Sequence, residues 1–76
     1  IARPAFNIYP NPVNSSFTID IKGNFAYELI DINGKSVRKG NGQDKEVISI
    51  ADMAKGIYIL RITTSETNYV SRLVKE

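Results

Sequence analysis

The sequence contains neither histidine nor cysteine. Their absence excludes Ser-His and Cys-His nucleophilic pairs, and it excludes zinc sites built from His or Cys ligands. No disulfide framework can form either, which leaves the redox compartment open, because small domains without bridges occur inside and outside the cell. We therefore expect a protein that is not an enzyme and that holds no cofactor and no metal.

Long apolar runs and dense clusters of one charge are missing as well. No stretch approaches the roughly 18 apolar residues of a membrane-spanning helix. The net charge is only +2 and the Lys and Arg residues are scattered, so neither direct membrane insertion nor nucleic acid binding is expected. The chain starts at Ile1 without Met or a signal sequence, and we expect it to be a piece of a longer protein.

The acidic residues offer only weak candidates for chemistry. Four carboxylates fall at predicted strand ends and turns, where a solvated Asp is usual: Asp20, Asp31, Asp44 and Asp52. The segment from Asp31 resembles the start of a calcium loop, but Lys35 holds its fifth position and Gly42 its twelfth, where a bidentate Glu is required. A hairpin turn is the better interpretation.

Hydrophobic periodicity predicts an all-β chain. With 76 residues and an ordinary balance of apolar and charged residues, the sequence predicts one folded domain over 6–76, entered through the end of a linker at 1–5. Short segments that alternate at period two are separated by Gly, Pro, Asn and Ser residues. The expected strands are 6–9, 16–21, 25–32, 35–39, 46–50, 56–62 and 69–74. This pattern indicates an immunoglobulin-like β-sandwich of about seven short antiparallel strands.

The longest uninterrupted run of β-forming residues starts at Gly56 and ends at Ile62. We expect it to be the central strand, with Tyr58, Leu60 and Ile62 on the face that enters the core. The last strand should lie beside it. Before it, a single turn is expected to place Met53 on the core.

Turn residues divide the remaining strands. Pro10, Asn11 and Pro12 predict a rigid corner, because neither proline can donate a backbone hydrogen bond to a sheet. Asn33 and Gly34 predict a hairpin with a type I′ turn, in which both residues have positive φ. A turn at 23–24 and a loop over 40–44 are also expected, and the latter lacks the lysine and helix of a phosphate loop.

Seven aromatic residues leave two interpretations open: Tyr9, Tyr27, Tyr58, Tyr69, Phe6, Phe17 and Phe25. In small sandwiches aromatic side chains mostly belong to the core. Exposed on one face, they would instead form a stacking platform for sugars. The second interpretation corresponds to an adhesion or carbohydrate-binding module of an extracellular protein.

Four pieces occur in an order typical of one family. They are residues 8–12 (Ile-Tyr-Pro-Asn-Pro), 31–35 (Asp-Ile-Asn-Gly-Lys), 56–62 (Gly-Ile-Tyr-Ile-Leu-Arg-Ile) and a basic terminal strand with residues 72–76 (Arg-Leu-Val-Lys-Glu). Together they resemble the type A C-terminal sorting domain of the type IX, or Por, secretion system of Bacteroidetes. The resemblance extends from about Phe6 to the last residue.

The resemblance implies a secretion signal. Such a domain would pass through the periplasm and cross the outer membrane with its covalently attached upstream cargo, and a sortase-type cysteine peptidase would remove it at the cell surface. The cargo would then be released or anchored. The implied partners are the type IX translocon, its outer-membrane shuttle and the surface sortase, and the cleavage point would lie at or before residues 1–5.

The resemblance also assigns positions. Pro10, Asn11 and Pro12 match the opening turn, Asn33 and Gly34 the hairpin, Gly56, Tyr58 and Leu60 the core strand, and Arg72 and Lys75 the basic last strand. An exposed edge of that strand can be extended by a partner strand, whose affinity comes from main-chain hydrogen bonds. We therefore expect Ser71, Arg72 and Lys75 to take part in recognition by the translocon.

Overall fold

The computed structural model describes residues 6–76, so the predicted linker end at 1–5 lies outside the described residues. The described chain is all-β and forms one antiparallel sheet of five strands: β1 (Phe6–Tyr9), β2 (Ser16–Ile30), β3 (Ser36–Ser49), β4 (Gly56–Thr63) and β5 (Asn68–Lys75). Residues 6–76 contain no helix that is long and apolar enough to cross a membrane.

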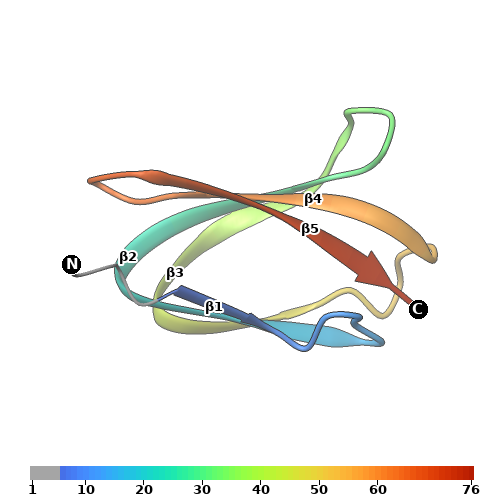
Figure 1. Ribbon diagram of the computed structural model, residues 1–76, viewed down its shortest axis with the longest axis horizontal. Helices are drawn as coiled ribbons and strands as arrows, with labels where there is room; N and C mark the ends of the chain where they lie inside the picture. The colour runs from blue at the N-terminus through green and yellow to red at the C-terminus, as the bar shows by residue number, and fades with distance from the viewer. Residues whose placement is uncertain (1–5) are drawn as a thin grey trace.

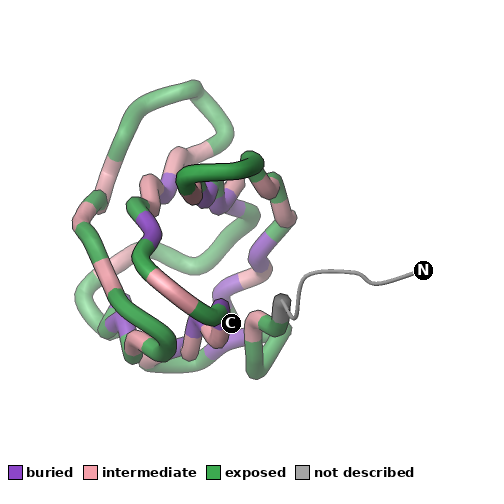
Figure 2. The backbone as a smooth tube through the Cα atoms, turned by 90° about the vertical axis from the view of Figure 1, so that its left-hand side faces the viewer, coloured by how far each residue is buried: buried purple, intermediate pink, exposed green. Residues whose placement is uncertain are grey.

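The sheet curls because its two longest strands bend together. β2 pairs along one side with β3, and along its other side first with β1 and then with β4, which in turn pairs with β5. The bend divides the sheet into a lower layer of β1 with the adjoining halves of β2 and β3, and an upper layer that contains their other halves with β4 and β5 (Figure 1). Seen from the side, buried segments surround the space between the layers (Figure 2).

The expected number of seven strands is corrected to five. Strands predicted at 16–21 and 25–32 are the halves of β2, and those predicted at 35–39 and 46–50 are the halves of β3. At the bend, Gly23 has a φ of 93° and Asp44 a φ of 64°, and the Gly23 N–H donates to Asp44 Oδ1 over 2.8 Å. A register shift between Asp20 and Asn24 absorbs the bend, so the chain continues as a strand where a turn was expected.

Two glycines make room for aromatic rings across the β2–β3 pair. Gly40 lies opposite Tyr27 and Gly42 opposite Phe25. A Cβ atom on Gly42 would stand 2.5 Å from Phe25 Cζ, and one on Gly40 would stand 2.7 Å from the Tyr27 hydroxyl oxygen. These residues were expected in a loop, but they belong to β3, where their missing side chains let the rings cross the strand.

The core confirms the predicted alternation. Tyr58, Leu60 and Ile62 are buried, and β4 is an internal strand between β2 and β5. Phe17, Ile19 and Ile21 of β2 pack with them, as do Ile48 of β3 and Ile50, which directly follows β3. β2 has more neighbouring strands than β4, however, so the sheet is organised around β2.

The hairpin at Asn33 and Gly34 is present, but its predicted type I′ turn is wrong. Only Gly34 has positive φ, at 86°. The Asp31 carboxylate accepts hydrogen bonds from the N–H groups of Asn33 and Lys35, both at 2.9 Å, and the Gly34 N–H donates to the Asp31 carbonyl oxygen over 3.0 Å. The turn is therefore stabilised by the side chain of Asp31, and Asn33 does not need a positive φ.

The connection before β4 forms a turn, as predicted. The Met53 N–H donates to the Ile50 carbonyl oxygen over 3.0 Å, and the Met53 side chain packs on the core. The Tyr58 hydroxyl donates to the Ala54 carbonyl oxygen over 2.6 Å. The buried ring of Tyr58 thus ties this turn to the strand that follows it.

Candidate docking surface

The last strand separates its side chains onto two faces. Val70, Arg72 and Val74 lie opposite Arg61, Ile59 and Ile57 of β4, on the side that points away from the core. Leu73 is fully buried on the other side. Because side chains alternate along a strand, Ser71 and Lys75 share the inner side with Leu73.

The three predicted recognition residues are therefore not equivalent. Arg72 is exposed, and it forms no ion pair with any residue in the range 6–76. Lys75 is only 9% exposed and lies opposite Gly56. Ser71 is half-buried opposite Leu60. Of the three side chains, only that of Arg72 can be reached on the outer side.

Residues 10–13, which we call the strap, cover part of the free edge of β5. The Val13 N–H donates to the Val74 carbonyl oxygen and the Glu76 N–H donates to the Val13 carbonyl oxygen, both over 2.8 Å. Val13 is fully buried, so its side chain anchors the strap in the core. The peptide bonds before Pro10 and Pro12 are both cis.

Asn11 acts as a short substitute for a neighbouring strand. Its Nδ2 donates to the Arg72 carbonyl oxygen over 3.0 Å, and its Oδ1 accepts from the Val74 N–H over 3.1 Å. An amide group offers one donor and one acceptor, as a peptide unit does. The predicted opening turn and the predicted basic strand, which are distant in sequence, thus meet at one edge of the sheet.

The outer side of the upper layer combines apolar and basic side chains. We define the outer face as Glu28 and Ile30 of β2, Lys39 of β3, Ile57, Ile59 and Arg61 of β4, and Val70, Arg72 and Val74 of β5. Val70 is 67% exposed. Three cations accompany one anion, Glu28, whose carboxylate lies 3.4 Å from Arg61. The face is therefore partly apolar and carries a positive excess.

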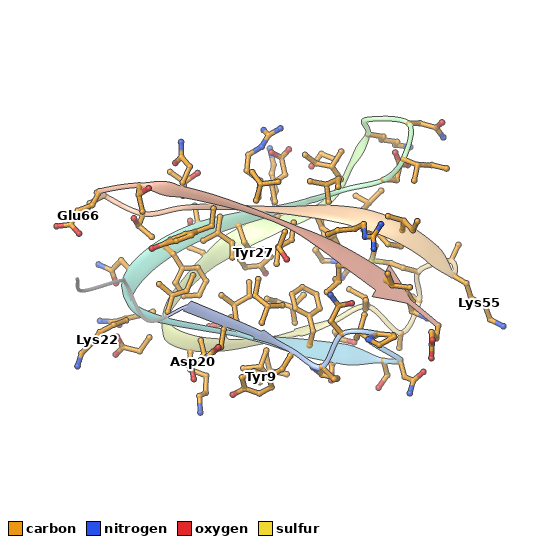
Figure 3. The ribbon with its side chains drawn as sticks, viewed as in Figure 1. Tyr9, Asp20, Lys22, Tyr27, Lys55 and Glu66 are labelled. Atoms are coloured by element: carbon orange, nitrogen blue, oxygen red, sulfur yellow. The ribbon has the colours of Figure 1, made fainter. Side chains whose placement is uncertain are left out.

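Away from the strap, the two edge strands of the curled sheet, β1 and β5, do not pair with each other. No Cα atom of β1 lies within 8 Å of one in β5. Figure 3 shows Tyr9 of β1 below the lower layer, whereas Tyr27, from the half of β2 that pairs with β4, lies between the layers. Among residues 6–76, Val13 closes one end of the β1–β5 seam, and no described strand pairs with β5 at the other end.

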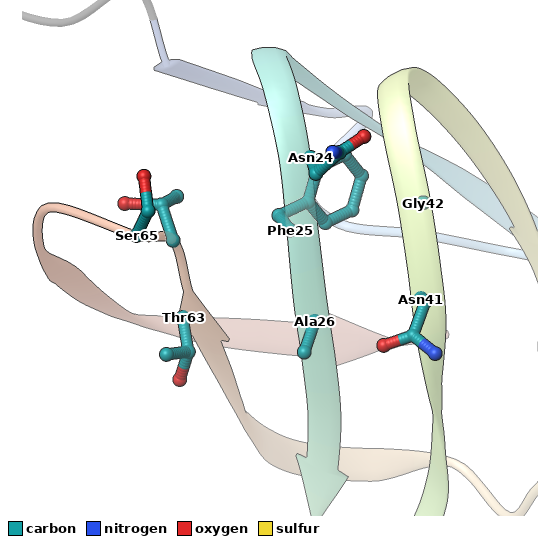
Figure 4. Close-up of a pocket in the computed structure, with 8 residues that line it drawn as sticks. Asn24, Phe25, Ala26, Asn41, Gly42, Thr63 and Ser65 are labelled. Atoms are coloured by element: carbon teal, nitrogen blue, oxygen red, sulfur yellow. The ribbon is translucent and has the colours of Figure 1, made fainter.

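A surface hollow between β2, β3 and the end of β4 offers no catalytic chemistry. Its lining consists of Asn24, Phe25, Ala26, Asn41, Gly42, Thr63, Thr64 and Ser65 (Figure 4). None of these lining residues is ionisable, so they include no general acid or base. Phe25 is buried and presents no stacking platform. Among the described aromatic side chains only Tyr9 is exposed, which does not favour the carbohydrate-binding alternative.

Some of the other predicted motif residues lie at the same end of the sheet as the strap, because Gly56 pairs with Lys75, which forms a bridge with Val13. Asn33 of the hairpin lines one hollow together with Gly56 and Tyr58 of the core strand, whereas Gly34 forms the turn itself and Leu60 lies in the core. The sequence interpretation missed Val13, which it left in a loop. The signal was its position as a lone apolar residue between the corner and the Asn-Ser residues that follow.

Comparison with protein families gives a match over nearly all of the chain. A search of curated proteins gives no match for the chain. The family model described as "Secretion system C-terminal sorting domain" matches residues 7–76 and therefore includes the strap, the hairpin and both C-terminal strands. The chain belongs to the family of C-terminal sorting domains of type IX secretion.

Proposed function

We propose that this domain carries an attached upstream cargo protein across the outer membrane through the type IX translocon and its shuttle. The observation that supports the proposal is the family match over residues 7–76. The family is one of sorting signals rather than enzymes, and its members are exported toward the cell surface or secreted. In this proposal the domain passes through the periplasm folded and has no catalytic activity of its own.

Removal of the domain forms the second part of the proposal. A surface sortase-type cysteine peptidase cuts the chain in or before residues 1–5 once the cargo has crossed, and the cargo is then released or anchored. Mass spectrometry of the exported cargo tests this part. A mature C-terminus upstream of residue 6 is expected, and a surface cargo that still carries residues 56–76 would contradict it.

Recognition of the domain is proposed to involve the last strand. Arg72 is the exposed member of the predicted set, whereas Ser71 and Lys75 contribute to the inner side of β5 and to the fold. We also propose that the bent sheet is an immunoglobulin-like sandwich in which two pairs of strands have become continuous.

A truncation tests the sorting role in the cargo-bearing protein. Deletion of Val70–Glu76 removes Leu73 from the core and all basic residues of β5, so the cargo should stay in the periplasm. The matched control replaces the exposed Lys45 of the lower layer with alanine and should export normally. Unimpaired secretion of the truncated protein would contradict the sorting role.

A further inference from the structure

Among residues 6–76, hydrogen-bonding partners occur along only half of the free edge of β5. The main-chain groups that face the strap belong to alternate residues, Arg72, Val74 and Glu76. Alternate residues of a strand direct their N–H and C=O groups to the same side. The N–H and C=O of Val70 and the N–H of Arg72 therefore point to the same free side, and no partner for them occurs within residues 6–76.

The occupied half shows that this edge can accept another strand. Val13 forms a parallel bridge with Lys75, and the Asn11 amide continues the ladder to Arg72. The strap then turns away, so the ladder stops where the open half begins. Val13 is fully buried, which makes the strap a fixed boundary for any strand that pairs further along β5.

The residues around the unpaired half of the β5 edge indicate which side chains a partner strand would carry. Toward the core, Ile8 of the edge strand β1 is half-buried and packs on the core cluster. On the outer face, Arg72 has no ion pair with a described residue, and Val70 is largely exposed. A strand in this seam would thus meet apolar contacts on its inner side and positive charge on its outer side.

From these observations we propose that a partner protein adds a strand to the Asn68–Arg72 part of β5, within the β1–β5 seam. The partner strand alternates apolar side chains, which face Ile8, with acidic side chains, which face Arg72. Main-chain hydrogen bonds to Val70 and Arg72 provide affinity, and the alternating side chains provide selectivity. The inference rests on the proposed sorting function for the identity of the partner, a component of the export machinery.

A binding assay with the whole 76-residue chain tests this proposal without the secretion machinery. The probe is a fluorescent peptide of about seven residues, long enough for the open edge at about 3.3 Å per residue, with alternating valine and glutamate. A peptide with lysine in place of glutamate is the control. Fluorescence anisotropy should show about tenfold weaker binding of the lysine peptide, since each exposed charge contact contributes modestly. Backbone amide shifts in NMR spectra should centre on Val70 and Arg72.

Variants separate edge pairing from charge. Arg72→Glu should reverse the preference so that the lysine peptide binds better, whereas Lys45→Glu on the outer side of the lower layer should leave the preference unchanged. Val70→Pro removes the outward N–H and should abolish binding of both peptides; because an edge proline can also affect folding, its NMR spectrum must remain dispersed.

Several results would overturn the proposal. Equal affinity for both peptides, no binding of the glutamate peptide, or amide shifts confined to β3 would each contradict it. The sorting function fails separately, since it depends on export of a fused cargo and not on the peptide. A domain that directs export but does not bind the glutamate peptide would refute only the proposed partner chemistry.

Discussion

Replacing Asn11 with alanine should destabilise the domain, because this side chain makes two hydrogen bonds to the edge of β5. The bonds join its Nδ2 to the Arg72 carbonyl oxygen and the Val74 N–H to its Oδ1. A neutral hydrogen bond contributes roughly 0.5–1.5 kcal/mol, and Asn11 is exposed, so water can replace part of what is lost. We expect the free energy of unfolding to fall by about 1–2 kcal/mol. For a domain of this size, each 1 kcal/mol corresponds to a change in Tm of about 4–8 °C.

Thermal unfolding followed by circular dichroism measures this change, and hydrogen exchange locates it. The Val74 amide should lose protection in Asn11→Ala, while the Leu73 amide, which lies on the β4 side of the strand, should keep it in the native state. Asn14→Ala is the matched control, because Asn14 is exposed in the same loop and should change stability by less than about 0.5 kcal/mol. An unchanged Tm together with an unchanged Val74 exchange rate would refute the role of Asn11 as a strand substitute.

Substitutions at three further positions test the packing and the bend. Gly42→Ala should lower the free energy of unfolding by roughly 1–3 kcal/mol, because the added Cβ would displace the Phe25 ring. Urea unfolding measures the loss. A variant as stable as the parent would contradict the close approach of the Phe25 ring to Gly42. Asp44→Ala should lower the free energy of unfolding by about 1–2 kcal/mol in the same assay, because the hydrogen bond to Gly23 is lost and alanine is strained at positive φ. Asp44→Asn should be nearly neutral. Equal losses of stability in the two variants would argue against a hydrogen-bonded bend. Tyr58→Ala should cost roughly 3–5 kcal/mol and impair export through misfolding, while Tyr58→Phe should cost about 1 kcal/mol; normal export of a destabilised Tyr58→Ala domain would show that export does not require the intact fold.

Local patterns in the sequence identified most strand segments and their inward faces. Period-two alternation placed Phe17, Ile19 and Ile21 on one side of β2, and it placed Tyr58, Leu60 and Ile62 on one side of β4. This succeeds because the period of a strand is a local property and one face of each strand is buried. β3 is an edge strand, and the charge that Arg38 and Lys39 give to its start is typical of such a strand.

Features that depend on contacts between residues distant in sequence could not be predicted from the sequence. Gly23 has the composition of a turn, but the carboxylate of Asp44 converts it into a bend within a continuous strand. Gly40 and Gly42 are typical of a loop when only neighbouring residues are considered. They belong to a strand because they lie opposite Tyr27 and Phe25. In the same way, the role of Asn11 requires knowing that the strap returns to β5, since its partners lie 61 and 63 residues away.

For the strand predicted to take part in recognition, the structure tests its position and not its role. The last strand does lie beside β4, with a free edge, and the strap divides that edge in a way that the sequence alone did not indicate. Alternation along β5 would have separated Arg72 from Ser71 and Lys75 before the structure was known. The participation of these residues in docking remains a prediction.

The most direct measurement of the central claim is export of a fused reporter. Residues 1–76 are joined to the C-terminus of a periplasmic reporter in a host with an active type IX system, and in the same host without its translocon. The account predicts reporter at the surface or in the medium of the first host only, with a loss of export when Leu73→Ala unfolds the domain. Reporter retained in the periplasm of the competent host, with the domain folded, would contradict it.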